Sequence, residues 1–196
     1  MRETKRDAIL GVARDLFLER GFEGTSIDQI AEAARVSRQT IYNNFEGKEA
    51  LFRALTDMLV DHVVEPLPGE GGDLESNLTA LAERALALAV LPSTLALHRL
   101  VVAEAPTFRD LALQVYAAGA KHAADRLAAY LRHQHERGLL TIDDPDLAAE
   151  HFFGMLICHW QYRALLGIEQ PAGASVRERA EKSVGTFLRA YGRAGR

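Results

Sequence analysis

The sequence predicts an all-α protein, because apolar residues recur every three or four positions along most of the chain and no segment shows the alternation of a strand. Capping residues, prolines and glycines divide this pattern into segments of helical length. The chain has 196 residues, 48% hydrophobic and 26% charged, which is ordinary globular usage. We therefore expect a small N-terminal helical domain, residues 1–48 with a structural core at about 4–55, and a larger C-terminal helical bundle, residues 49–196.

Three short helices are predicted before residue 48. The first runs from about Lys5 to Arg20 and stops at Gly21. The second opens at Ser26, which stands three residues before Gln29 as in a capping box, and Ser37 caps the third. Each helix start is thus marked by a side chain that can accept a backbone hydrogen bond.

A fourth helix is predicted from near Lys48, and the run Pro66–Gly72 then interrupts all periodicity. Beyond that break the pattern is helical to the end. The first predicted segment starts at Asp73 or Ser76 and stops before Pro92, and the next two are Leu95–Val101 and Phe108–Leu131. A further helix is predicted from about Asp146 to Leu166, after the cap pair Asp144–Pro145. The last runs from Ser175 to Tyr191.

The second and third helices together predict a helix-turn-helix. Their apolar positions follow helical spacing and would bury against each other: Ile27, Ile30, Ala31, Ala34, Ile41 and Phe45. The outward positions of the third helix are polar: Arg38, Gln39, Thr40, Tyr42, Asn43 and Asn44. Such side chains can read base edges in a major groove, so the sequence indicates DNA binding. The alternative is a helix pair with a solvated polar face.

Charge and motif content narrow the function further. The net charge is −4 and the pI about 6.0, so a nucleic-acid footprint must be a local patch. We find no Gly-rich phosphate loop, no Gly-x-Ser-x-Gly and no His-Glu-x-x-His, and we expect neither an enzyme nor a cofactor. The seven histidines show no metal-ligand spacing, and no metal is expected.

The single cysteine, Cys158, has apolar neighbours and is expected to be a buried, inert thiol, although a redox sensor is the alternative. One cysteine fits a reducing compartment. No signal peptide and no apolar run of membrane-spanning length is visible, so the expected location is cytoplasmic.

Residues from about Thr4 to Leu55 resemble the tetracycline-repressor (TetR) family of bacterial one-component regulators. The matching residues are Gly21-Phe22, Thr25-Ser26-Ile27, Ile30-Ala31, Ala34, Val36-Ser37, Thr40-Ile41-Tyr42, Phe45 and Lys48-Glu49-Ala50-Leu51. A second similarity, to an AefR-like C-terminal domain, is carried by Leu97–Val101, Glu104-Ala105, Phe108 and Asp144–Ala149. The resemblance implies a homodimer that binds a palindromic operator on double-stranded DNA and usually senses a small molecule in its C-terminal domain.

Carried over by residue, the resemblance implies phosphate contacts by Thr25 or Ser26, Ser37, Thr40, Tyr42 and Lys48. It implies base contacts by Arg38, Gln39 and Asn43, with Asn44 as a further candidate. Many relatives have a small residue at Gln39 and an aromatic or His at Asn43 and Asn44, so the pairing of side chain and base stays open. Arg2, Lys5 and Arg6 form either a basic arm toward the DNA or flexible terminal charge.

The segment Asp146–Leu166 is apolar on more than one side, and the last helix adds an apolar stripe. A homodimer through these two helices is therefore expected, with interface residues Phe152, Met155, Val184, Phe187 and Tyr191. An all-internal core is the alternative.

The expected effector is a mostly apolar molecule of unknown identity. Candidate lining residues are Leu59, His62, Val63, His98, Val101, Tyr116, Phe153, Ile157 and Trp160. The fourth helix would link this site to the DNA-reading helices through Leu51, Phe52 and Leu55. Two other classes remain open, namely control by a protein partner and an enzyme or carrier that uses the bundle pocket.

Overall fold

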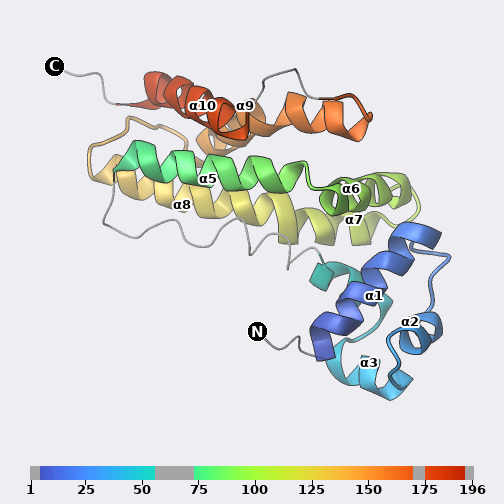
Figure 1. Ribbon diagram of the computed structural model, residues 1–196. Helices are drawn as coiled ribbons and strands as arrows, with labels where there is room; N and C mark the ends of the chain where they lie inside the picture. The colour runs from blue at the N-terminus through green and yellow to red at the C-terminus, as the bar shows by residue number, and fades with distance from the viewer. Residues whose placement is uncertain (1–4, 56–72, 170–174, 193–196) are drawn as a thin grey trace. The chain divides into compact units, whose positions relative to one another are not determined.

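The computed structural model describes residues 5–55, 73–169 and 175–192, and within them the fold is all-α (Figure 1). The contacts divide the chain into two compact units. The N-terminal unit comprises Met1–Leu59 and Ala96–Gly119, and the C-terminal unit comprises Val60–Leu95 and Ala120–Arg196. The first unit therefore includes a segment from the middle of the chain, Ala96–Gly119. The predicted division at residue 48 assigned this segment to the C-terminal domain.

The N-terminal unit contains α1 (Lys5–Arg20), α2 (Ile27–Ala33), α3 (Arg38–Asn44), a helical stretch at residues 48–55, most of α6 (Pro92–Glu104) and α7 (Arg109–Tyr116). Its core is centred on an aromatic cluster, Phe17, Phe22, Phe52 and Phe108, with neighbouring ring centroids 5.3–5.6 Å apart. The cluster joins four different elements, because its rings come from α1, the α1–α2 turn, the stretch 48–55 and the start of α7. Ring pairs at this spacing stabilise the packing beyond their buried area.

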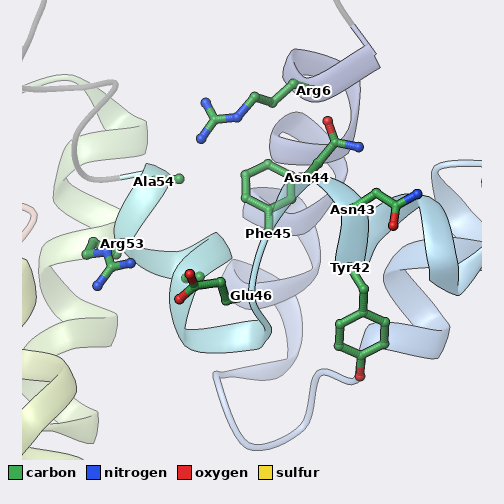
Figure 2. Close-up of a pocket in the computed structure, with 9 residues that line it drawn as sticks. Arg6, Tyr42, Asn43, Asn44, Phe45, Glu46, Arg53 and Ala54 are labelled. Atoms are coloured by element: carbon green, nitrogen blue, oxygen red, sulfur yellow. The ribbon is translucent and has the colours of Figure 1, made fainter.

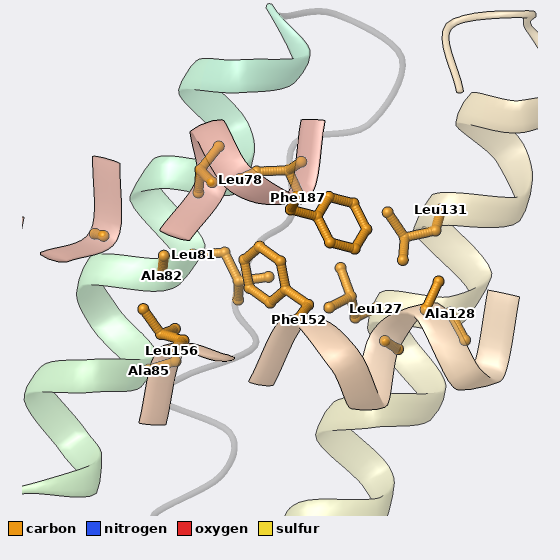
Figure 3. Close-up of a cluster of buried hydrophobic side chains, with 14 of the residues drawn as sticks. Leu78, Leu81, Ala82, Ala85, Leu127, Ala128, Leu131, Phe152, Leu156 and Phe187 are labelled. Atoms are coloured by element: carbon orange, nitrogen blue, oxygen red, sulfur yellow. The ribbon is translucent and has the colours of Figure 1, made fainter. Parts of the chain in front are cut away.

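The C-terminal unit is a bundle of α5 (Leu74–Ala89), α8 (His122–Glu136), α9 (Pro145–Leu165) and α10 (Val176–Tyr191). α5 packs chiefly on α10, and α8 packs on α9. Figure 3 shows the buried side chains that fill the space between them: Leu78, Leu81, Ala82 and Ala85 of α5, Leu127, Ala128 and Leu131 of α8, Phe152 and Leu156 of α9, and Phe187 of α10. The core follows the predicted apolar stripes.

Helix starts agree with the sequence. Asp73 and Ser175 are the N-caps of α5 and α10, and each accepts a hydrogen bond from the backbone N–H three residues later. Asp144 caps α9, and Pro145 occupies the first turn. The predicted continuous helix from Phe108 to Leu131 is wrong in one respect, because a π-helical turn, η1 (Ala117–Lys121), separates α7 from α8.

The dimer prediction requires a correction at α9 and α10. Phe152, Val184 and Phe187 are 0–1% exposed in the single chain, so their side chains belong to the protomer's own core and cannot line a second interface. Apolar periodicity predicts that these side chains are buried, but it does not show whether their own subunit or a second subunit buries them. Met155 is exposed, and the Tyr191 hydroxyl lies 2.6 Å from His151 Nδ1, which ties α10 to α9.

The exposed side of α9 differs from the prediction in a second way. Cys158, expected to be buried, is exposed. It lies on the same side of the helix as four exposed apolar residues, Leu147, Met155, Tyr162 and Leu166, which are spaced by eight, seven and four positions. α9 is thus apolar on both its buried and its exposed sides.

Among the described residues, no single helix is long and apolar enough to cross a membrane. Only α5 and α6 taken together, across the break between them, reach that length and composition.

Candidate nucleic-acid interface

Local hydrogen bonds fix the geometry of α2, the turn and α3. The Ser26 hydroxyl accepts from the Gln29 N–H, and the Gln29 side chain accepts from the Ser26 N–H at 2.8 Å, which completes the predicted capping box. Ser37 caps α3 by accepting from the Thr40 N–H at 3.1 Å, and its hydroxyl is also 2.8 Å from the Thr40 hydroxyl. Ser37 thus supplies acceptors for the Thr40 and Ile41 N–H groups in the first turn of α3.

The turn between the two helices depends on Arg35, whose φ of 53° lies in the left-handed region. The Arg35 N–H donates to Glu32 O and the Val36 N–H donates to Ala31 O at 2.9 Å, the pair of bonds that defines a Schellman motif. Val36 then packs on the core with Ala31. This turn sets the angle at which α3 leaves α2.

The buried side of α3 is formed by Ile41, which is 0% exposed, with Phe45 beyond the helix end. Its opposite side is exposed at Arg38, Gln39, Asn43 and Asn44, and Tyr42 is 51% exposed. The Gln39 amide donates to Asn43 Oδ1 at 2.9 Å, one turn apart. Such a pair leaves amide donors and acceptors pointing outward, which suits the N6/N7 edge of adenine.

Two of the polar groups are used within the unit. Asn44 Nδ2 donates to Thr40 O at 2.7 Å, so this amide folds back on its own helix. Arg38 is bound by Asp28 of α2, because both Nε and Nη2 of its guanidinium face the carboxylate oxygens. This ion pair joins the first residue of α3 to the first turn of α2.

The predicted phosphate contacts fall into two groups. Ser26 and Ser37 are exposed, whereas Thr25 is 1% exposed and its hydroxyl donates to Leu16 O and Gly21 O. Of the alternatives Thr25 and Ser26, only Ser26 therefore presents a hydroxyl to a ligand in this structure. Lys48 is half-buried, and its ammonium donates to Phe22 O at 2.8 Å above the Phe22 ring.

A groove of about 320 Å³ flanks the C-terminal end of α3 (Figure 2). Its walls include Tyr42, Asn43, Asn44, Phe45, Glu46, Ala50, Ala54 and two arginines, Arg6 and Arg53. The Arg6 guanidinium lies 4.8 Å from the centre of the Phe45 ring. Lys5 and Arg6 form the first turn of α1, so these two charges are on a helix and not on a terminal arm; Arg2 lies outside the described residues.

Comparison with known proteins agrees with this arrangement. Residues 9–55 match the family model "Bacterial regulatory proteins, tetR family", and residues 76–193 match "AefR-like transcriptional repressor, C-terminal domain". The chain belongs to the TetR family of bacterial transcriptional regulators. The two matches cover both the helix-turn-helix and the C-terminal helices.

Solved structures extend the match over nearly the whole chain. A TetR-family regulator from Mesorhizobium loti is 31% identical, with a TM-score of 0.80 and coverage of 96% of this chain and 97% of that one. The flavonoid-responsive regulator FrrA is 30% identical, with a TM-score of 0.81 and coverage of 97% and 98%. Among curated relatives, AlkX from Mycobacterium tuberculosis is 38% identical over 76 residues, which span 37% of this chain and only 36% of AlkX.

The TetR family consists of DNA-binding transcriptional regulators and not of enzymes, in agreement with the interpretation of the sequence. The individual DNA contacts remain predictions. Sequence reasoning did not include Asp28 and Arg53. Both are charged residues close in sequence to predicted contacts, since Asp28 stands ten residues before Arg38 and Arg53 five residues after Lys48. Their positions in space depend on the turns between the helices, which sequence spacing does not give.

The predicted effector residues are divided between the two units and a segment that the structure does not describe. Leu59, His62 and Val63 lie outside the described residues. His98, Val101 and Tyr116 belong to the N-terminal unit, whereas Phe153, Ile157 and Trp160 belong to the C-terminal unit. These residues therefore stay a prediction.

Three of the candidates have surroundings that can be described. Val101 borders a space of about 10 Å³ with Phe52, Glu104, Ala105, Phe108 and Ala112, which is no larger than one water needs. Trp160 is mostly buried beneath the Arg179 guanidinium, 5.2 Å from the ring centre. Partial burial lowers the pKa of His98, so this imidazole is neutral at physiological pH.

Within the described ranges, no three His, Cys, Asp or Glu side chains gather in a way that would hold a metal ion.

Proposed function

We propose that this TetR-family protein is a homodimeric repressor that binds a palindromic operator through two copies of α3 and releases it when a small molecule binds the C-terminal unit. The observation that carries the proposal is the outward polar side of α3, which two caps and a Schellman turn hold in a fixed orientation. A rigid helix of this composition suits direct readout in the major groove.

The flanking groups support a role in DNA binding. Ser26, Ser37 and Tyr42 are exposed beside α3, and Arg6 and Arg53 border the groove at its end. Hydroxyls and guanidinium groups there would position the phosphate backbone on both sides of the base-reading residues. A footprint of this kind is local, as the net charge of −4 requires.

The exposed side of α9 supports dimerisation. Leu147, Met155, Tyr162 and Leu166 form an apolar stripe that the chain itself leaves uncovered. Packing this stripe against its symmetry mate would remove it from water. In the dimer, two recognition helices would lie about one DNA turn, ~34–36 Å, apart.

The proposed coupling route runs through α6 and α7. The chain leaves the C-terminal unit near Leu95, forms α6 and α7 in the N-terminal unit, and returns at Ala120. Phe108 packs edge-on against Phe22 at 5.3 Å, and the Glu104 carboxylate lies 3.2 Å from where a Cβ on Gly21 would be. A ligand that shifts α5 or α8 would therefore move segments that contact the α1–α2 turn.

The predicted contribution of the fourth helix is retained in part. Leu51, Phe52 and Leu55 are buried in the N-terminal unit, as expected, while residues 56–72 lie outside the described residues. FrrA is named a flavonoid-responsive regulator, which makes planar aromatic compounds a suitable first screen for this chain. Ligand and operator must weaken each other's binding by the same factor, typically about 5- to 150-fold.

The test begins with selection of genomic fragments bound by the protein, followed by titration of the recovered duplex. Light scattering gives the oligomeric state of wild type, Met155→Glu and Tyr162→Glu, with Leu113→Glu, an exposed apolar residue on α7, as the matched control. The proposal expects monomers only for the two α9 variants, together with weakened operator binding. Failure of the wild type to retain any fragment above background would refute the repressor proposal.

A further inference from the structure

The C-terminal unit contains a partly buried arginine, Arg84, two of whose donor atoms are buried without an acceptor. Nε and Nη2 of Arg84, in the middle of α5, are buried and have no hydrogen-bond acceptor in the described structure. A guanidinium keeps its charge in proteins, so it cannot relieve its burial by losing a proton. Burial of unpaired charged donors costs free energy, and such a group in a folded protein requires an explanation.

The position of Arg84 on α5 shows which side of the helix it occupies. Arg84 is seven residues after Asn77, two helical turns, so the two residues lie on the same side. The buried Asn77 amide donates to the Tyr130 hydroxyl of α8 at 3.2 Å. This side of α5 therefore faces α8.

α8 runs in the direction opposite to α5 (Figure 1), and the Asn77–Tyr130 hydrogen bond joins the two helices. Seven positions back from Tyr130 is Ala123, a partly buried residue that packs on the apolar core. Seven residues are two helical turns, so Ala123 and Tyr130 lie on the same side of α8.

The nearest acidic residues in sequence are engaged elsewhere. Glu83, next to Arg84, faces Arg177 of α10 at 3.9 Å. Asp125, two residues after Ala123, accepts from Lys121 at 2.6 and 2.8 Å. Within the described residues, these two carboxylates therefore face cations other than Arg84.

We infer that Arg84 receives the carboxylate of a small organic anion, and that the effector of this regulator is therefore an acid with an apolar body. Nε and Nη2 lie along one edge of the planar guanidinium, and their parallel N–H groups match the two oxygens of a carboxylate. Leu81 and Leu88 stand three and four positions from Arg84 on the same side of α5, and their apolar side chains suit the carbon skeleton of such a ligand.

This inference rests on the proposed function and narrows it to one chemical class. Arg84 lies in the C-terminal unit, whereas the DNA-reading helices lie in the other unit. Substitution of Arg84 is therefore expected to change the response to the ligand without changing operator affinity in its absence. The unpaired charge also implies that the empty site costs stability, as binding sites commonly do.

The test uses the full-length protein and matched pairs of probes, namely octanoate with octanamide and cinnamate with cinnamamide. Thermal denaturation and release of a selected operator duplex are measured for wild type, Arg84→Gln and Arg126→Gln. Arg126 is an exposed arginine of α8, so its variant removes the same charge from the surface. We expect at least one acid to bind the wild type and the Arg126→Gln variant, and to bind the Arg84→Gln variant about 10- to 100-fold more weakly. The amides should not show this difference.

A second variant, Arg84→Met, tests the unpaired state without any ligand. Its melting temperature should equal or exceed that of the wild type, because an apolar chain of similar length replaces an uncompensated charge. A melting temperature several degrees lower would show that the guanidinium has a structural partner, and the inference would be wrong.

The remaining outcomes separate this inference from the proposed function. If no acid is preferred over its amide by the wild type, or if Arg84→Gln keeps the preference, the assigned ligand class is wrong. If neutral compounds release the operator, the repressor proposal stands and only the inference that the effector is an organic anion is wrong. If the wild type binds no duplex in the absence of any compound, the proposed function fails independently of Arg84.

Discussion

The Asp28–Arg38 ion pair gives a quantitative prediction for DNA binding. Both side chains are largely exposed, 55% and 64%, so the pair contributes at most about 1 kcal/mol to the stability of the free protein. A bidentate arginine–guanine contact discriminates by about 1–3 kcal/mol. Guanine can therefore compete for the guanidinium, and Asp28 limits the net gain while holding Arg38 at the start of α3.

Removal of each partner should act in opposite directions. Arg38→Ala loses the base contact, and we expect operator affinity to fall by about 5- to 150-fold, equivalent to 1–3 kcal/mol, with relaxed preference at one base pair. Asp28→Ala removes a carboxylate that faces the polyanion and frees the guanidinium. It should tighten binding to operator and scrambled duplex alike, and the salt dependence should steepen by about one phosphate equivalent, a slope change of ~0.9.

A double-mutant cycle measured by fluorescence anisotropy at two salt concentrations separates these effects. If Asp28 acts through Arg38, the effect of Asp28→Ala should shrink in the Arg38→Ala background. Gln39→Ala is the matched control, because Gln39 is exposed on the same helix and does not contact Asp28. Equal effects of Asp28→Ala with and without Arg38 would refute the coupling, and unchanged operator binding by both Arg38→Ala and Tyr42→Ala would refute the placement of α3 in the groove.

Three further predictions concern a phosphate contact, the core and acid stability. Lys48→Met should weaken binding to all duplexes and flatten the salt slope by about 0.9 if its ammonium reaches a phosphate; an unchanged slope would restrict Lys48 to its bond with Phe22 O. Phe187→Ala, at a fully buried ring, should lower the free energy of unfolding by about 3–5 kcal/mol in urea titrations. Hydrogen bonds from the Ser76 N–H and hydroxyl lower the pKa of Asp73 below 3.8, so its contribution to stability is present above that pH and is lost as the pH falls through the lowered value. Asp73→Asn should flatten this part of a pH series of urea denaturation curves, and an unaltered profile would contradict the assignment.

Local chemistry made much of the fold predictable. The starts of α2, α3, α5, α9 and α10 follow from side chains that accept backbone hydrogen bonds within three residues. N-capping hydrogen bonds join residues that are neighbours in sequence, so they can be predicted without a structure. The π-helical turn η1 was not predicted, because the residues of Ala117–Lys121 also occur in ordinary α-helical turns.

The exposed polar side of α3 was predictable from equally local information, since a seven-residue helix with one buried stripe must expose the rest. Its internal contacts were not. Arg38 is held by a carboxylate ten positions earlier, and Lys48 donates to a carbonyl 26 positions earlier. The first contact depends on the turn at Arg35, and the second depends on the packing of the stretch 48–55 against the α1–α2 turn.

The dimer interface shows why apolar periodicity has a limit. Phe152 and Met155 are both apolar and stand three residues apart on α9, yet the first is 1% exposed and the second 38%. A side chain buried by its own subunit and one buried by a second subunit have the same chemistry, so the sequence indicates that α9 is covered twice without indicating which side meets which partner. The structure shows that Phe152 is buried within the protomer, because α10 places Phe187 against it at 5.3 Å, and that Met155 is exposed. Truncation of Phe152 should therefore reduce the stability of the protomer, whereas a charge at Met155 should change its oligomeric state.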